Sequence, residues 1–415
     1  MRSNDTVSLV SPARAWTIAS LLFVAGFINY LDRAIVSIAL PVIAVDLHLG
    51  PTAKGVLLSA FFWSYALMQL PVGWAVDRYN LRWLYAASFA LWSLACGFTG
   101  LAASLGALLF MRAILGIGES IYLPGGMKIV SVLFGAKDRG LASGLMNCGT
   151  RAGLALGAPL IAFLVHSYGW HASFSILGFG SVFWLIPWLA VFPSNVRFER
   201  TAPAPSVRRT LATLDRNLLG MCLGHFGYGY YWYLLVTWLP DYLVESRHMT
   251  PLVRAGGYTM IPFLVFAASE PLGGWIADRL VALGCNERRS RKAVVTAAFL
   301  TSAMLLVAGR TAGDAAAVLM IGAASLVGLS TGNLYVLTAN SAPESEVGVW
   351  MGVLNFAGNI SGVVAPIVTG VLIARTGSYY PGFVVAVVTL LFGLPAYWFL
   401  VGEKKQHAAE VSADA

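Results

Sequence analysis

Long apolar stretches recur along the chain, separated by short polar connections. Runs of about 20 hydrophobic residues, the length that an α-helix needs to cross a bilayer, lie at approximately 16–40, 54–76, 82–102, 105–130, 140–164, 172–192, 217–240, 254–277, 292–310, 313–337, 347–373 and 379–401. A polar tail precedes the first run and offers no plausible cleavage site for a signal peptide, so we expect that run to be retained. The pattern predicts an all-α membrane protein with twelve transmembrane helices.

The composition and the placement of charge agree with this pattern. Of 415 residues, 58% are hydrophobic and 11% are charged, whereas a soluble globular protein carries about 25% charged residues. A net charge of +8 would suggest nucleic acid in a soluble protein, but most Lys and Arg here lie in the tails and on alternate connections. The positive-inside rule then predicts both termini in the cytoplasm. We expect a multi-pass protein of the bacterial cytoplasmic membrane, in contact with lipid and without a nucleic-acid partner.

The apolar rhythm breaks once, near the middle of the chain. Residues 193–213 are rich in Pro, Ser and Arg, which is typical of a polar linker. We therefore expect one domain at residues 1–192, a cytoplasmic linker at 193–213 and a second domain at 214–415. Each domain would hold six helices.

The two halves repeat each other. The segment PVGWAVDR recurs as LGGWIADR, so Asp77 and Arg78 correspond to Asp278 and Arg279 at an offset of 201. A second echo, GLASGLMNCGTR against GVWMGVLNFAGN, has an offset of 208. Two matches at nearly the same period predict two pseudo-symmetric six-helix bundles, related by an axis along the membrane normal.

Several ionisable residues interrupt the apolar runs. Asp32 and Arg33 are adjacent in the first run, and Arg112 and Glu119 lie seven residues apart in the fourth, on one helix face. A charge at bilayer depth is costly, by about 2.5 to 3.5 kcal/mol on insertion scales. We expect the four to neutralise one another around a polar cavity between the bundles, either as a functional cluster or as a fixed structural one. Lys128 lies near a helix end, from which its side chain can reach the interface.

Twelve spans, a central basic loop and the internal repeat together resemble the major facilitator superfamily. The loop segment GWAVDRYNLRW is similar to the signature of that superfamily, with Asn80 in place of its usual loop glycine. Asp77, Arg78, Asp278 and Arg279 are thus predicted to pair across the halves in one state and to separate in another. The alternative is that these residues are only positive-inside anchors.

Further motifs resemble the anion:cation symporter family within this superfamily, which includes bacterial sugar-acid transporters and animal vesicular glutamate and sialic-acid transporters. These motifs are NYLDRA, AFFWSYALMQLPVGW, RAILGIGES, TWLPDYLVESR and NFAGNISGVVAPIVTG. The resemblance implies that Asp32 and Glu119 bind the coupling proton, that Arg33 meets the substrate carboxylate and that Arg112 pairs with Glu119. It also implies a cavity lined by Tyr30, Tyr65, Asn355 and Asn359.

Two further features add candidates for the cavity. Arg151 is the repeat mate of Asn359; it would serve a second anionic group on the substrate, brace Glu119 or have a structural role. The seventh run, HFGYGYYWYLLVTW, is dense in aromatic residues, and we expect Tyr230 or Tyr231 to touch the substrate. His225, near the start of that run, is expected to be structural.

These features predict a proton-coupled symporter that imports a small organic anion by alternating access. A sugar acid such as an aldonate or a hexuronate is expected, and aromatic or dicarboxylic acids are also compatible with the sequence. So are a lysolipid exporter of the spinster type and an anion-sensing receptor. We find no phosphate-binding loop, no nucleophile elbow and no metal-ligand spacing, so we expect no enzyme activity, no metal and no cofactor other than the proton. A monomer is expected.

Overall fold

The computed structural model describes residues 10–193, 215–343 and 346–402. The first half contains α1 (Pro12–Asp46), α2 (Pro51–Val76), α3 (Leu81–Thr99), α4 (Leu105–Glu119), α5 (Tyr122–Leu133), α6 (Ala136–Ser181), η1 (Val182–Trp184) and α7 (Leu185–Val191). The second contains α9 (Arg216–Asp241), η2 (Tyr242–Ser246), α10 (Leu252–Ala282), α11 (Glu287–Thr301), α12 (Ala303–Arg310), α13 (Asp314–Ala324), η3 (Ser325–Ser330), α14 (Thr331–Ser341), α15 (Val347–Thr376), α16 (Tyr380–Pro395) and η5 (Ala396–Leu400). Apart from Pro193, the predicted linker lies outside the described residues.

Within the described ranges these helices make twelve passes, as predicted. Eight helical runs are long and apolar enough to cross a membrane. One of them, Asp138–Val191, holds two passes, because Gly169 has φ 78° and ψ 164° and breaks α6 there. Glycine adopts positive φ without a steric penalty. α4 with α5, α11 with α12, and α13 with η3 and α14 each form one interrupted pass.

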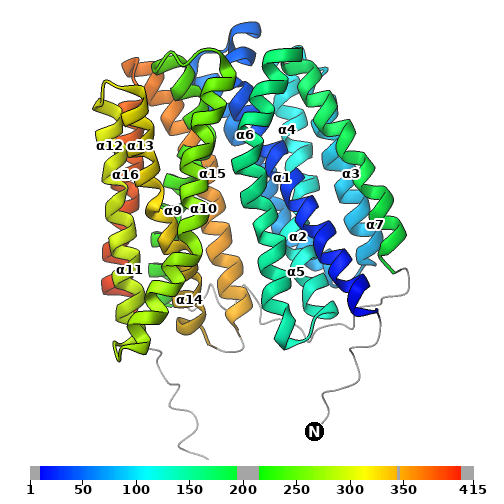
Figure 1. Ribbon diagram of the computed structural model, residues 1–415, viewed down its shortest axis with the longest axis vertical. Coiled ribbons are helices and arrows are strands. Elements are labelled where there is room, and N and C mark those ends of the chain that lie inside the picture. Colours follow the sequence, from blue (N-terminus) through cyan, green and yellow to red (C-terminus); the bar gives the residue numbers. More distant parts are fainter. Residues whose placement is uncertain (1–9, 194–214, 344–345, 403–415) are drawn as a thin grey trace, which may run out of the picture.

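The helices form two bundles that stand side by side (Figure 1). α1 to α7 make up one bundle and α9 to α16 the other. The contacts between the bundles are made by α2 with α15, α6 with α10 and α1 with α9. α2 and α10 correspond in the sequence repeat, as do α6 and α15, so the α2–α15 and α6–α10 contacts are equivalent under the pseudo-symmetry.

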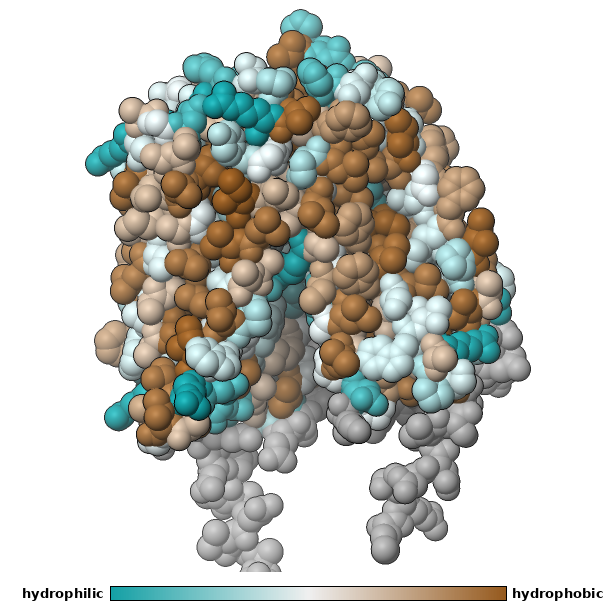
Figure 2. Space-filling model, in the orientation of Figure 1, coloured by the Kyte–Doolittle hydropathy of each residue, from teal (hydrophilic) through white to brown (hydrophobic). Residues whose placement is uncertain are grey.

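The bundles pack tightly at one end and separate toward the other. The tight end holds the connection between α1 and α2 and the start of α10. A Cβ added to Gly55 would lie 2.5 Å from the Pro366 carbonyl oxygen, and one on Gly256 would lie 2.5 Å from Ala162 Cβ. Only glycine permits such an approach at either crossing. At the opposite end Figure 2 shows a groove between the bundles in which hydrophilic residues are visible.

Candidate functional site

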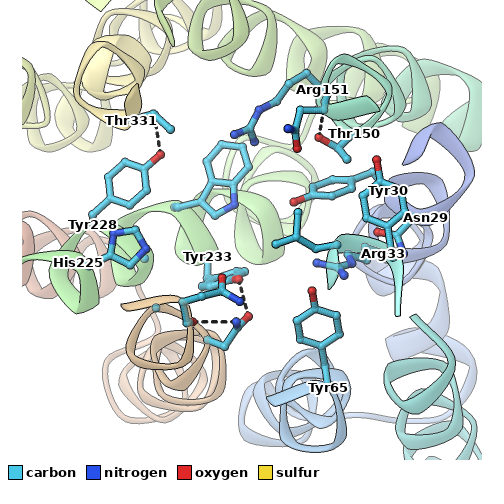
Figure 3. A pocket seen from close by; sticks show the side chains of 18 of the residues that line it. Asn29, Tyr30, Arg33, Tyr65, Thr150, Arg151, His225, Tyr228, Tyr233 and Thr331 are labelled. Atoms are coloured by element: carbon cyan, nitrogen blue, oxygen red, sulfur yellow. Dashed lines mark hydrogen bonds between the residues drawn. The ribbon is translucent and has the colours of Figure 1, made fainter. Parts of the chain in front are cut away.

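A polar cavity of about 180 Å³ lies between the bundles. Its walls come from α1, α2, α5 and α6 of the first bundle and from α9, α14 and α15 of the second. One water needs only about 10 to 15 Å³ of such volume, so the cavity has room for a small solute. Figure 3 shows that tyrosine, asparagine and arginine side chains converge on it from both bundles.

Arg33 of α1 is the charged centre of one side of the cavity. Its Nε donates to Glu119 Oε2 at 2.7 Å, and Glu119, at the end of α4, is fully buried. The guanidinium lies 5.0 Å from the ring centre of Tyr30 and 4.6 Å from those of Phe61 and Tyr65. The predicted residues Tyr30, Arg33 and Tyr65 all line the cavity. Three ring faces and one carboxylate thus hold this cation in place.

Glu119 has a different partner from the one that the resemblance implied. Arg112 does not bind the glutamate; its Nη1 donates to the backbone carbonyl of Asp32 at 3.2 Å. Arg112 instead lines a second pocket of about 20 Å³ that also borders Arg33. Arg33 on α1 thus joins the cavity to the buried Glu119 on α4. Of the four expected charges, Arg33 and Glu119 form an ion pair, and Arg112 bonds the backbone of Asp32.

Asp32 points into its own bundle. Successive residues on a helix are rotated by about 100°, so Asp32 and the neighbouring Arg33 face different surroundings. Asp32 is buried, lies outside the lining of the cavity and is near the guanidinium of Arg112 and the thiol of Cys96. Among the described residues no N–H or O–H group donates to its carboxylate.

Arg151 of α6 pairs across the bundle interface. Its Nε donates to Glu270 Oε2 at 2.9 Å, and its Nη2 donates to Oε1 of the same carboxylate. The structure contradicts the expected contact with Glu119, because Arg151 pairs with Glu270 of α10 instead. Glu270 is not among the site residues predicted from the sequence. Its charge was the available signal, since Glu270 is an acid inside the apolar run 254–277.

The tyrosines of α9 differ from the prediction. Tyr228 and Tyr233 line the cavity, whereas Tyr230 and Tyr231 do not. The Tyr231 hydroxyl donates to the Ala324 carbonyl at 3.0 Å inside the second bundle. The cavity face of α9 carries residues spaced by three or four positions, and Tyr230 and Tyr231 fall between them. A dense aromatic run therefore does not identify which of its members faces the site.

The second bundle contributes the predicted amides and one histidine. Asn355 and Asn359 both line the cavity. Tyr233 donates to Asn359 Oδ1 at 3.1 Å, and Asn359 Nδ2 donates to the Asn355 carbonyl at 2.8 Å. His225, expected to be structural, is buried at the cavity wall against Tyr228. Its place one turn before Tyr228 on α9 explains why it reaches the site.

The predicted charge pairs at the open end lie within the bundles in this structure. Asp77 accepts from Lys128 at 2.8 Å, and Asp278 accepts from Arg291 at 2.9 Å. Arg78 lies over the Trp74 ring at 4.4 Å, and Arg279 lies in the last turn of α10. Among the described residues no ion pair joins the bundles at this end. That arrangement is the separated one of the two expected states.

An ion pair does join the bundles at the tight end, and neither of its partners was predicted from the sequence. Lys54 at the start of α2 donates to Asp241 Oδ1 at 2.9 Å, and Tyr379 donates to Oδ2 at 2.6 Å. Lys54 and Asp241 are both buried. Lys54 also lies 3.9 Å from Glu245. Below this layer the Phe62 and Tyr233 rings are 4.4 Å apart, so aromatic packing separates the cavity from the tight end.

The chain is similar to curated bacterial transporters over nearly its whole length. It is 28% identical to the probable galactarate/D-glucarate transporter of Bacillus subtilis, with 94% of this chain and 92% of that protein covered. It is 31% identical to the probable L-galactonate transporter of Escherichia coli K12, over 92% and 88%. It is 29% identical to the hexuronate transporter of Bacillus subtilis, over 88% and 89%.

A solved structure and a family model agree with the fold. A bacterial homologue of the lysosomal transporter Spinster, crystallised in an inward-facing and unoccupied conformation, matches with a TM-score of 0.79 at 19% identity, over 94% of this chain and 97% of that one. At that identity the match supports the fold alone. The sequence model of the Major Facilitator Superfamily matches residues 22–366 and 286–415. The chain therefore belongs to the Major Facilitator Superfamily and is a multi-pass membrane transporter rather than an enzyme.

Proposed function

We propose that this transporter imports a small sugar acid, such as an aldonate or a hexuronate, together with protons by alternating access. The observation that carries the proposal is the ion pair between Arg33 and Glu119 beside the central cavity. Arginine presents parallel N–H donors that match a carboxylate. A proton taken up by Glu119 would release the guanidinium to an incoming anion. Proton and substrate would then meet at one side chain.

The conformation supports the direction of transport. If the termini are cytoplasmic, as the positive-inside rule predicts, the separated end of the bundles faces the cytoplasm. In this state Glu119 holds Arg33, which would displace a substrate carboxylate toward the cell interior. In the opposite state a protonated Glu119 would leave Arg33 free to bind the anion from outside.

Asp32 is a second position for the coupling proton. Its buried carboxylate receives no N–H or O–H donor from the described residues, and a buried charge without such hydrogen bonds is costly. A proton on Asp32 would remove that cost without a change in packing.

The nature of the cavity supports a polyhydroxylated acid. Amide and hydroxyl groups from Asn147, Thr150, Tyr228, Thr331 and Asn355 line it, and such groups bind substrate hydroxyls. The relatives named above include transporters of galactonate and of hexuronate. The polar walls of the cavity argue against a lysolipid substrate, which needs a broad apolar opening.

An aromatic acid is the second candidate substrate, because several aromatic rings border the cavity. Tyr30, Tyr65, Trp232 and Tyr233 all contribute to its walls. Their faces could stack on an aromatic substrate as well as on a sugar acid. The two candidates share the carboxylate that would bind Arg33 and differ in the rest of the molecule.

Counterflow in proteoliposomes tests the proposal. Vesicles loaded with unlabelled galactonate should accumulate labelled galactonate, and an inward proton gradient should drive net uptake. Exchange of 4-hydroxybenzoate without exchange of galactonate or glucuronate would favour the aromatic candidate. Binding of galactonate without any exchange would instead indicate a receptor.

A further inference from the structure

Two arginines with permanent positive charge line the cavity, among the residues that the structure describes, and each is paired with a glutamate. Arg33 gives one hydrogen bond to Glu119, and Arg151 gives two to Glu270. The proposed function uses only the first pair. The second lies on the α6–α10 side of the cavity, where the Arg151 guanidinium packs 5.3 Å from the Trp232 ring centre.

The two glutamates have different surroundings. The Glu119 side chain is 0% exposed, whereas that of Glu270 is 19% exposed. Solvent reduces the cost of keeping Glu270 ionised, and a bidentate arginine contact stabilises the ionised form further. A second substrate carboxylate would have to replace Glu270 on Arg151. A substrate whose other end carries a hydroxyl or an aldehyde group would not have to replace Glu270.

On the basis of the proposed function, we infer that Glu270 is a specificity-determining residue that occupies Arg151 and so restricts the substrate to one carboxylate. Arg151 is then a latent second anion subsite. With Glu270 charged, only Arg33 is available to an anion, through protonation of Glu119. With Glu270 neutral, the cavity presents two arginines, one on each side, and accepts a dicarboxylate.

Calorimetric titration of the purified full-length transporter tests the inference. We would compare two matched pairs of ligands, galactonate with galactarate and butyrate with succinate. The titrations are made at pH 7.5, where all carboxyl groups of the four ligands are ionised. The measured quantity is the ratio of the dicarboxylate to the monocarboxylate association constant. This ratio cancels any shift between inward and outward conformations that loss of the α6–α10 contact would cause, because both ligands experience that shift equally.

Glu270→Gln should raise the ratio by about tenfold or more, the effect of one added charge-assisted contact. The double variant Glu270→Gln with Arg151→Gln should lose the gain, because the gain depends on the freed arginine. Asp314→Asn is the matched control. Its carboxylate pairs at 3.7 Å with Arg254 away from the cavity, so the ratio should not change. Glu270→Asn replaces Glu270→Gln if thermal unfolding shows that the latter is misfolded.

Three results would overturn the inference. These are an unchanged ratio in Glu270→Gln, a gain that persists in the double variant, or a wild-type protein that prefers the dicarboxylate in both ligand pairs. Galactonate and galactarate could fail to bind while Glu270→Gln raises the ratio of the succinate to the butyrate association constant. That result would contradict the sugar-acid function and support the role of Glu270. Absence of binding by all four ligands in every variant would contradict both.

Discussion

Asp32 and Arg33 are neighbours in sequence, yet they do different chemistry. Arg33 faces the cavity and pairs with Glu119, while Asp32 points into the bundle without an N–H or O–H donor from the described residues. One helical residue step of about 100° is enough to separate them. The two adjacent charges of the first membrane span therefore lie in different places: Arg33 lines the cavity and Asp32 does not.

Neutralising Glu119 should uncouple transport from the proton. In Glu119→Gln the side chain can no longer hold Arg33 by charge, so Arg33 stays available and the anion is not displaced by deprotonation. We expect uptake driven by a pH gradient to fall to background, while counterflow of the proposed substrate remains measurable in proteoliposomes. Proton-driven uptake at the wild-type rate would remove Glu119 from the coupling mechanism.

Replacing Arg33 by lysine should weaken substrate binding while preserving the positive charge. Lysine lacks the planar fork of arginine, so one charge-assisted hydrogen bond of about 1.5 to 3 kcal/mol is lost. We expect the apparent substrate constant to rise by at least about tenfold. The measurement is counterflow at varied galactonate concentration, and a wild-type constant would count against the role of Arg33 in binding.

The rotation of α9 about its own axis decides which of its aromatic residues face the cavity. His225, Tyr228, Trp232 and Tyr233 line the cavity, and Tyr231 is bonded within its own bundle. Aromatic residues occur on every face of this segment, so the sequence alone does not show which face lines the cavity. Its main packing partners in the second bundle, α15 and α16, set the orientation.

Two conservative variants on α9 should have opposite effects. Tyr233→Phe removes a hydroxyl that bonds Asn359 at the cavity, so we expect a higher substrate constant and little change in thermal unfolding. Tyr231→Phe leaves the buried Ala324 carbonyl without its donor, at a cost of about 1 to 3 kcal/mol in stability. We expect it to unfold at a lower temperature and to keep its substrate constant. The reverse assignment of effects would contradict the orientation of α9.

The contacts between the bundles are unevenly distributed along the membrane normal. At the tight end a buried ion pair, Lys54 with Asp241, and close backbone contacts join the bundles. At the other end the ion pairs of Asp77 and Asp278 stay within their own bundles. Alternating access requires the first set of contacts to break and a set at the other end to form. We therefore expect the ion pair between Lys54 and Asp241 to stabilise the conformation described here.

Removing Lys54 should favour the opposite conformation. Loss of one partner from a buried ion pair costs about 3 to 5 kcal/mol, and opening of the tight end would return Asp241 to solvent. In Lys54→Ala we expect the ratio of the two conformations to shift by about 100-fold or more. The measurement is the distance distribution between spin labels at positions 48 and 378, which should lengthen.

Arg254→Ala is the control for this shift. Arg254 pairs with Asp314 at the same end of the molecule, but both residues belong to the second bundle. Its loss should leave the label distances unchanged. Equal shifts in the two variants, or none in Lys54→Ala, would mean that Lys54 does not lock the bundles.

The amino-acid sequence was sufficient for the number of membrane spans and for the two-bundle fold. Each span is a local property, because about 20 apolar residues must satisfy their own backbone in the bilayer. The repeat of Asp77 and Arg78 as Asp278 and Arg279 indicated the pseudo-symmetry of the two bundles. The motifs around Asp32 and Glu119 indicated the family. The family resemblance also implied that Tyr30, Arg33, Tyr65, Asn355 and Asn359 belong to the cavity, and the repeat added Arg151; all six line it.

Only the tertiary structure decided which charges pair. Arg33 rather than Arg112 holds Glu119, Arg151 meets Glu270, and Lys54 meets Asp241. Hydropathy and motif spacing describe each helix separately, whereas an ion pair depends on the rotation of two helices and on which bundle each belongs to. The partners of Arg151 and Lys54 lie 119 and 187 residues away. Those separations are bridged only when the bundles pack, so the chemistry of the cavity is a property of the packed bundles.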